Sequence, residues 1–200
     1  NFDDCLEASD YSNFKNRFEE SRTRSKIRGL GISNSITGVA STNFEHVEIR
    51  FDPSGNISLL SGAMDHGQGH ATTFKQVLAD TLQIDTDEIE YRFGDTDKIA
   101  HGVGTFNARC AVFVSGAVIN AATKILEKGK LIAAHVLESA ASDIEYSGGS
   151  FKVAGTDYEI SLKEVAQIAF QKPKLPPDIE PGLYEHGEFG MGLGQAPTYP

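Results

Sequence analysis

The sequence has little cysteine and no excess of positive charge, and each shortage excludes a class of protein. Two cysteines, Cys5 and Cys110, are too few and too far apart for a disulfide framework or a cysteine metal site. The 200 residues carry a formal net charge of -10, which leaves no basic surface for a nucleic-acid backbone. General nucleic-acid binding is therefore excluded, and a reducing, cytoplasmic location is expected.

Long uninterrupted apolar runs are also missing. The most apolar stretch, residues 111–137, contains Asn120 and several charged residues, so no membrane-spanning helix is expected there. The chain begins with Asn1 and shows no signal peptide, which predicts a segment of a longer polypeptide. A hydrophobic content of 40% and a charged content of 23% are typical of one compact domain or two small ones.

Periodicity predicts an α+β domain in which helices cover a mixed sheet. Alternating apolar residues predict strands over 47–51, 57–60 and 89–93, and the turn sequence DPSGN joins the first two as a hairpin. Helical spacing predicts helices over about 70–83 and 110–137. A hairpin around Gly148 and Gly149 and a short helix, opened by a capping box of Ser161 and Glu164, complete the order.

Composition divides the chain into three parts. Residues 1–27 are polar and charge-mixed, which predicts a connecting arm. Residues 28–171 form the folded domain, and its first strand, over 28–36, is interrupted by glycines. Residues 172–200 are rich in proline and glycine, so we expect an extended tail that packs on another part of a larger protein.

Two glycine-containing loops stand between a predicted strand and a predicted helix. Gly67, Gln68 and Gly69 precede the helix at 70–83, where free backbone N–H groups and the helix dipole favour an anion. The second loop, residues 102–109, has the same place before the helix at 110–137. It offers hydroxyl, amide and guanidinium donors to phosphate oxygens, from Thr105, Asn107 and Arg109. Loops at the same end of a sheet can converge on one ligand.

The residues alone leave a second interpretation open. Both loops could be simple turns, with Arg109 solvated or paired with an acid such as Asp95. Neither loop matches the GxGxxG or P-loop pattern, and the chain has no HExxH or GxSxG motif. Asp65, His66, His70 and His101 are possible metal ligands. Two glycines lie between His66 and His70, which argues against one helix that presents both histidines on one face, so no protein-bound metal is expected there.

The segments GAMDHGQGHATTFKQVLADTLQI and GDTDKIAHGVGTFNARCAVFVSGAV resemble the molybdopterin-binding region of the xanthine dehydrogenase and aldehyde oxidase family. The resemblance is strongest to large subunits of the aerobic carbon monoxide dehydrogenase type, and it runs from RGLGIS to APTYP. It implies a fragment of such a subunit, part of a domain that binds a molybdopterin dinucleotide, in its cytosine form. The remainder of the subunit, and partners with [2Fe-2S] clusters and FAD, are implied as well.

The resemblance also implies roles for individual residues. Pyranopterin contacts fall to Gly67, Gln68, Gly69 and His70, and phosphate contacts to Thr105, Asn107, Ala108 and Arg109. Molybdenum would be held by the cofactor's dithiolene, so no protein ligand to the metal is implied. No catalytic residue is assigned, because GLGQAP near the end has Gln195 where a GxGE segment has its glutamate, and glutamine cannot act as a carboxylate base.

The implied activity is that of a molybdenum-dependent oxidoreductase, which hydroxylates its substrate with oxygen from water. The isolated chain is expected to hold cofactor without turnover. The substrate stays open between carbon monoxide, an aldehyde and an N-heterocycle. The alternative is a non-catalytic scaffold or ligand-binding module whose site forms only with the missing segments.

Overall fold

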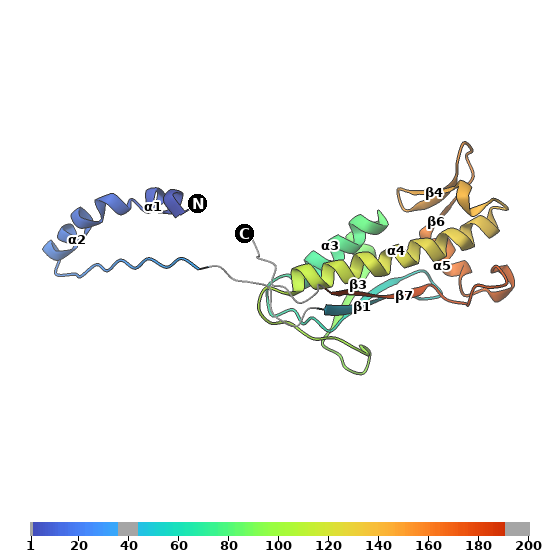
Figure 1. Ribbon diagram of the computed structural model, residues 1–200, viewed down its shortest axis with the longest axis horizontal. Helices are drawn as coiled ribbons and strands as arrows, with labels where there is room; N and C mark the ends of the chain where they lie inside the picture. Colours follow the sequence, from blue (N-terminus) through green and yellow to red (C-terminus); the bar gives the residue numbers. More distant parts are fainter. Residues whose placement is uncertain (1, 36–43, 191–200) are drawn as a thin grey trace. The chain divides into compact units, whose positions relative to one another are not determined.

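The computed structural model describes residues 2–35 and 44–190. The chain separates into two compact units, which divide between residues 37 and 38. The first unit contains α1 (Phe2–Ala8), a 3-10 turn (Tyr11–Asn13) and α2 (Phe14–Thr23), followed by an extended segment (Figure 1). Ser21 is the one buried residue among the described positions of this unit. The residues of this unit that the structure describes therefore form no hydrophobic core.

The prediction of a strand over residues 28–36 is wrong for residues 28–35, which the structure describes. Residues 28–35 form no strand, and Leu30 and Ile32 are exposed. A strand needs a neighbour that supplies ladder hydrogen bonds, and no described segment pairs with these residues. Ile36, the last apolar residue of the predicted strand, lies outside the described residues.

The second unit is built on a four-stranded mixed sheet with the strand order β3-β2-β1-β7. β1 (Phe44–Phe51) and β2 (Ile57–Ser61) form the predicted antiparallel hairpin. The Asp52 carboxylate holds its turn by accepting hydrogen bonds from the backbone N–H groups of Ser54 and Asn56, at 2.8 and 3.0 Å. β3 (Ile89–Phe93) runs parallel to β2.

The fourth strand comes from the segment predicted to be an extended tail. β7 (Tyr184–Gly190) pairs antiparallel with β1, so the folded unit continues past residue 171. Gly187 permits close contact with the covering helix, because a Cβ atom there would lie 2.1 Å from the Ala117 carbonyl oxygen. Asn120 and Lys124 donate to the Glu188 and His186 carbonyls, at 2.8 Å each, and so satisfy part of the sheet's edge.

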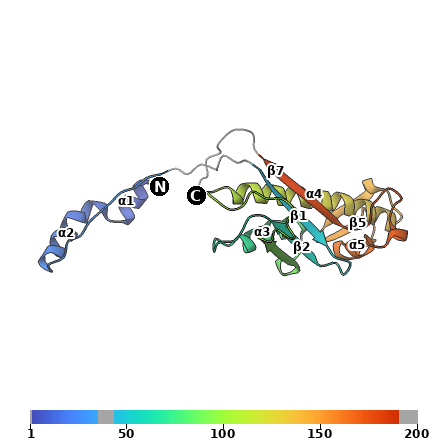
Figure 2. The same cartoon turned by 90° about the horizontal axis from the view of Figure 1, so that it is seen from below.

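Two helices cover one face of this sheet. α3 (His70–Leu82) and α4 (Cys110–Val136) begin close to the predicted residues, and α4 runs along β1 and β7 (Figure 2). α4 is long and apolar enough to cross a membrane, yet its apolar stripe lies in the core, as is typical of the central helix of a folded domain. The core between helices and sheet includes Val47, Ile49, Leu59, Phe74, Leu78, Val114, Ala121 and Ile125.

A small second sheet lies beside the C-terminal half of α4 (Figure 1). It consists of the antiparallel strands β4 (Ile144–Ser147), β5 (Ser150–Val153) and β6 (Glu159–Ser161). The turn at Gly148 and Gly149 and the Ser161–Glu164 capping box of α5 (Leu162–Ile168) are as predicted. Short 3-10 turns at Thr86–Glu88, Ala141–Asp143 and Lys172–Lys174 complete the unit.

The parallel pair β2 and β3 brings the two glycine-containing loops to one end of the sheet. β2 leads through the first loop into α3, and β3 leads through the second loop into α4. The loops touch at their starts, since a Cβ atom on Gly62 would lie 2.8 Å from the Cα of Gly102. Both residues must therefore be glycine-sized for the loops to approach this closely.

Candidate functional site

The first loop, residues 62–69, is held by the Asp65 carboxylate. One of its oxygens accepts from the Gly67 N–H at 2.8 Å, and the other accepts from the Ala71 N–H at 3.1 Å. These two bonds, Ala71 first, lower the pKa of Asp65 below its ordinary value. The N-terminus of α3, predicted to offer free N–H groups to an anion, is thus partly occupied by the chain's own carboxylate.

The Gln68 side chain folds back over the same loop. Its carbonyl oxygen accepts from the His66 N–H, and its amide nitrogen lies 3.5 Å from the Met64 carbonyl and 3.4 Å from Nδ1 of His70. Nδ1 of His70 lies 3.2 Å from the Met64 carbonyl, and the ring packs on Phe74. The Met64 carbonyl oxygen is therefore the point to which the polar groups of the first loop converge.

The second loop meets the first at this same oxygen. The Thr105 hydroxyl donates to the Met64 carbonyl at 2.7 Å. The loop bends through positive φ angles at Gly104 (100°) and at Asn107 (49°), a conformation that costs a residue with a Cβ atom more than it costs glycine. The two loops therefore contact each other at one end of the sheet, and their convergence on one ligand stays a prediction.

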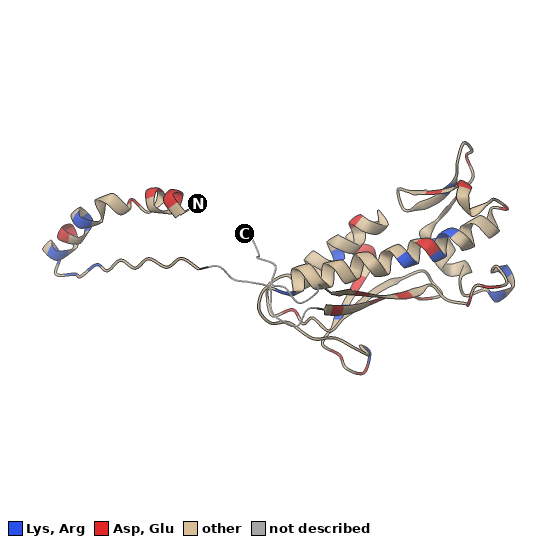
Figure 3. Cartoon of the chain, viewed as in Figure 1, with Lys and Arg blue, Asp and Glu red and all other residues tan. Residues whose placement is uncertain are grey.

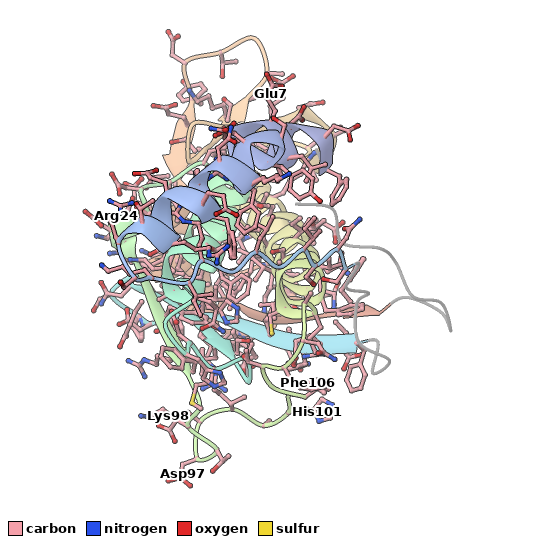
Figure 4. All side chains as sticks on the ribbon, turned by 90° about the vertical axis from the view of Figure 1, so that its left-hand side faces the viewer. Glu7, Arg24, Asp97, Lys98, His101 and Phe106 are labelled. Atoms are coloured by element: carbon pink, nitrogen blue, oxygen red, sulfur yellow. The ribbon has the colours of Figure 1, made fainter. Side chains whose placement is uncertain are left out.

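The segment that joins β3 to the second loop, residues 94–101, carries exposed side chains. Asp97 and Lys98 lie at its tip, whereas His101, like Phe106 of the second loop, lies nearer the folded unit (Figure 4). His101 stacks on Phe44 with ring centroids 5.3 Å apart. A cavity of about 410 Å³ beside this segment is lined by residues 94–96 and 99–104 and by Gly62.

Arg109 does not lie at the surface of the second loop. Its side chain is 0% exposed and forms an ion pair with Glu45, which is also 0% exposed. The guanidinium further donates to the carbonyl oxygens of Gly104 and Phe44. Its Nε is buried with no partner among the described residues. Asp95, the acid considered from the sequence, pairs instead with Lys98 at 2.6 Å.

Glu45 is the charged partner in this network that the sequence reasoning missed. It accepts the Val103 N–H at 2.9 Å and thereby ties β1 to the second loop. A signal for it exists: the alternation that buries Val47 and Ile49 also places Glu45 on the inward face of β1. A carboxylate on a buried face requires a partner, and Arg109 is the nearby cation.

The remaining surface of the loops is open. A Cβ atom on Gly67, Gly69 or Gly104 would meet no atom within 4 Å. The N-terminus of α4 has no side-chain cap. The charged residues of α4 begin at Lys124, in the middle of the helix (Figure 3). A ligand can therefore lie against the loop backbone, and an anion at the start of α4 meets no carboxylate from that helix.

Within residues 2–35 and 44–190, no three or more His, Cys, Asp or Glu side chains are grouped so as to hold a metal ion. The described loops offer amide, hydroxyl and backbone groups instead. Thr105 and Ala108 are half-buried, and Asn107 is exposed. Gln195 and its GLGQAP segment lie outside the described residues.

Comparison with known proteins identifies a family. The model of the molybdopterin cofactor-binding domain matches residues 4–199. The carbon monoxide dehydrogenase large chain of Afipia carboxidovorans is 35% identical over 178 residues, which cover 83% of this chain and 22% of that protein. The 6-hydroxypseudooxynicotine dehydrogenase complex subunit gamma of Paenarthrobacter nicotinovorans is 31% identical over 199 residues, covering 100% of this chain and 25% of that protein.

Solved structures agree with this assignment. Reconstituted carbon monoxide dehydrogenase from Oligotropha carboxidovorans superimposes with a TM-score of 0.76 at 29% identity, over 98% of this chain and 26% of that one. Quinoline 2-oxidoreductase from Pseudomonas putida 86 gives a TM-score of 0.73 at 28% identity, over 96% of this chain and 26% of that one. The chain spans about a quarter of the length of these relatives.

Proposed function

Since the chain belongs to the family of molybdopterin cofactor-binding domains of molybdenum hydroxylase large subunits, we propose that its two loops bind one molybdopterin dinucleotide. The observation that carries this proposal is the bond from Thr105 to the Met64 carbonyl, which joins the two loops into one surface. A ligand with a polar ring at one end and phosphates at the other matches a surface of this composition.

The first loop fits the pyranopterin end of the cofactor. Gly67 and Gly69 leave open space beside their backbone, where a planar ring can lie without meeting a Cβ atom. The Gln68 side chain bonds within the loop, yet its N–H₂ group has two donors and its oxygen two lone pairs, so it keeps capacity for the mixed hydrogen-bonding edge of a pterin. His70, which is 9% exposed, places its Nδ1 atom 3.4 Å from the Gln68 amide nitrogen and adds a polar group to this loop.

The second loop fits the phosphate end. Thr105 and Asn107 supply polar side chains, Ala108 supplies backbone, and the uncapped N-terminus of α4 supplies positive partial charge. Gly104, with open space beside it, lets an oxygen approach the backbone. Arg109 acts from beneath this loop, because its guanidinium is bonded to Glu45 and two carbonyls.

We further propose that the complete protein is a molybdenum-dependent oxidoreductase. The bound cofactor supplies the metal centre that takes electrons from the substrate, and water supplies the oxygen. The residues of this chain bind and orient the cofactor, and none of them is assigned to proton transfer. The remainder of the large subunit, partners with [2Fe-2S] clusters and FAD, the cytosine form of the cofactor and a cytoplasmic location belong to the same proposal.

The proposal is tested by measuring how much molybdenum and nucleotide the purified full chain contains after production in cells that make the cofactor. We expect molybdenum and a nucleotide, released by acid hydrolysis, in equal amounts. A variant with Gly67→Val and Gly104→Val, in which side chains fill the open space, should lose both. Gly155→Val, also at a positive φ angle (74°) and with nothing within 4 Å of a Cβ atom, is the matched control for backbone strain. Equal content in all three proteins would contradict the proposal.

A second function, a scaffold or ligand-binding module without catalysis, is favoured by one observation. The two strongest anion-binding features of the loops are engaged within the chain, since Asp65 caps α3 and Glu45 pairs with Arg109. A chain that never retains molybdenum or nucleotide, yet keeps both loops ordered, would support this alternative.

A further inference from the structure

The buried pair of Glu45 and Arg109 connects the second loop to β1, and none of the roles considered above uses Glu45. We infer that Glu45 is a positioning residue: acting through Arg109, it holds the backbone of residues 103–109 in the conformation that binds the phosphates. This inference rests on the proposed function, and it replaces a direct phosphate contact by the Arg109 guanidinium.

The contacts fix the loop at both of its ends. One Glu45 carboxylate oxygen accepts from the backbone N–H groups of Val103, at 2.9 Å, and of His46, at 3.3 Å. The other oxygen accepts from Arg109. The same Arg109 nitrogen donates to the Gly104 carbonyl at 2.6 Å. The start of the loop at Val103 and its end at Arg109 are thus held on one carboxylate.

The loop needs such support because its own conformation is unfavourable. Asn107 has both a positive φ angle and a Cβ atom, whereas Gly104 adopts its positive φ angle without strain. Strained backbone of this kind persists where the surroundings determine it from several sides. Three consecutive residues of the loop are each held by a hydrogen bond. The Val103 N–H donates to Glu45, and the Gly104 carbonyl accepts from Arg109. The Thr105 hydroxyl donates to the Met64 carbonyl.

An arginine is suited to this position, and a lysine is not. The planar guanidinium reaches acceptors on three residues, Glu45, Gly104 and Phe44. Its faces lie near two aromatic rings, with the Phe106 centroid at 5.2 Å and the Phe113 centroid at 5.5 Å. Both members of the pair are 0% exposed. Solvent therefore cannot replace either partner when the other is removed.

The test compares Glu45→Gln, Arg109→Met and the double variant in the full chain, with cytidine diphosphate as the probe of the phosphate site. In Glu45→Gln an amide N–H₂ group replaces one acceptor of the guanidinium, at unchanged size. We expect each single variant to bind cytidine diphosphate at least tenfold more weakly. The double variant should lose no more than the worse single variant, because the two residues act as one unit.

A stability control separates positioning from general destabilisation. Tyr146→Phe removes the hydrogen bond that the Tyr146 hydroxyl, on β4 of the second sheet, donates to the Leu82 carbonyl at the end of α3. It should lower the melting temperature and leave cytidine diphosphate affinity unchanged. Wild-type affinity in Glu45→Gln, with loss only in Arg109→Met, would overturn the inference and return Arg109 to direct phosphate contact. Fully additive losses in the double variant would overturn it as well.

A ligand-independent measurement keeps the inference separate from the proposed function. The Val103 amide, which donates to Glu45, should exchange with solvent at least tenfold faster in Glu45→Gln than in the wild type, relative to the Leu59 amide in the core. If the wild type binds no cytidine diphosphate, the proposed function fails. If Val103 exchange is unchanged in Glu45→Gln, the inference about Glu45 fails, whether or not the ligand binds.

Discussion

The hydroxyl of Thr105 donates a hydrogen bond of 2.7 Å to the carbonyl oxygen of Met64, 41 residues earlier in the chain. The same oxygen lies 3.2 Å from Nδ1 of His70. One backbone carbonyl thus connects the loop before α3 with the loop before α4. A change in the conformation of one loop is therefore expected to affect the other.

Removing the Thr105 hydroxyl should uncouple the loops. Thr105→Val keeps the shape of the side chain and deletes the donor, which costs about 1 kcal/mol for a neutral hydrogen bond. We expect cytidine diphosphate to bind about fivefold more weakly, measured by titration of the full chain. Thr123→Val is the matched control, because its hydroxyl donates within α4 to Ile119. Equal affinity in both variants would contradict the coupling.

The order of the first loop should depend on acid pH through Asp65. Hydrogen bonds from Ala71 and Gly67 lower its pKa below the ordinary value, which is about 3.9. Stabilisation from a lowered carboxyl pKa is present above the ordinary value and is lost as the pH falls through the folded one. The protection factor of the Gly67 amide, in which the exchange rate is corrected for the intrinsic pH dependence of exchange, should therefore fall below about pH 4.

Asp65→Asn tests this assignment directly. The variant should show fast Gly67 exchange at neutral pH already, and the change below about pH 4 should disappear. Asp157→Asn, in an exposed hairpin, is the control and should keep the wild-type profile. A Gly67 exchange profile that is the same in Asp65→Asn and in the wild type would exclude the carboxylate as the cap.

Two half-buried tyrosines predict loss of stability at alkaline pH. Burial raises the pKa of Tyr91, whose hydroxyl donates to the Ala63 carbonyl at 2.9 Å, and the pKa of Tyr146. Because the folded protein holds these protons more tightly, their contribution is complete below the ordinary value of about 10 and is lost as the pH rises above it. The urea midpoint should fall above about pH 10.

Variants identify the groups responsible. Tyr91→Phe with Tyr146→Phe should lower stability at neutral pH by about 1 kcal/mol for each lost hydrogen bond and flatten the alkaline decline. Tyr158→Phe, at a position 70% exposed, should reproduce the wild-type curve. An alkaline decline of unchanged slope in the double variant would assign it to other groups.

Close packing between β7 and α4 should make Gly187 intolerant of a side chain. A Cβ atom would lie 2.1 Å from the Ala117 carbonyl oxygen and 2.6 Å from the Ala121 nitrogen. Gly187→Ala should lower the free energy of unfolding by about 1–3 kcal/mol, since backbone on both sides would have to move. Gly31→Ala, with nothing within 4 Å, is the control. Wild-type denaturant midpoints for Gly187→Ala would show that β7 packs less closely.

Local signals predicted much of the fold. The helix predicted over 110–137 is observed as Cys110–Val136, because its apolar stripe repeats at helical spacing without interruption by glycine pairs or proline. The first hairpin followed from its turn residues. The contact between the two loops followed from their like positions before helices, since the strands that precede them are parallel neighbours.

The parts that the sequence did not reveal depend on contacts between distant residues. β7 pairs with β1 across more than a hundred residues, and its sequence YEHGEFG contains glycine and little alternation. The ion pair of Glu45 with Arg109 joins residues 64 apart, so no short motif contains it. The sequence pattern placed Asp65 only in a group of possible metal ligands and did not predict it as the cap of α3, because local propensity does not show which carboxylate an N-terminus accepts.

The measurement that tests the central claim most directly is an amide-resolved NMR titration of the full chain with cytidine diphosphate, the nucleotide end of the proposed cofactor. The account predicts saturable shifts confined to residues 66–70 and 102–109, with both loops giving the same dissociation constant. Shifts spread over the second sheet, or different constants for the two loops, would contradict a single shared site.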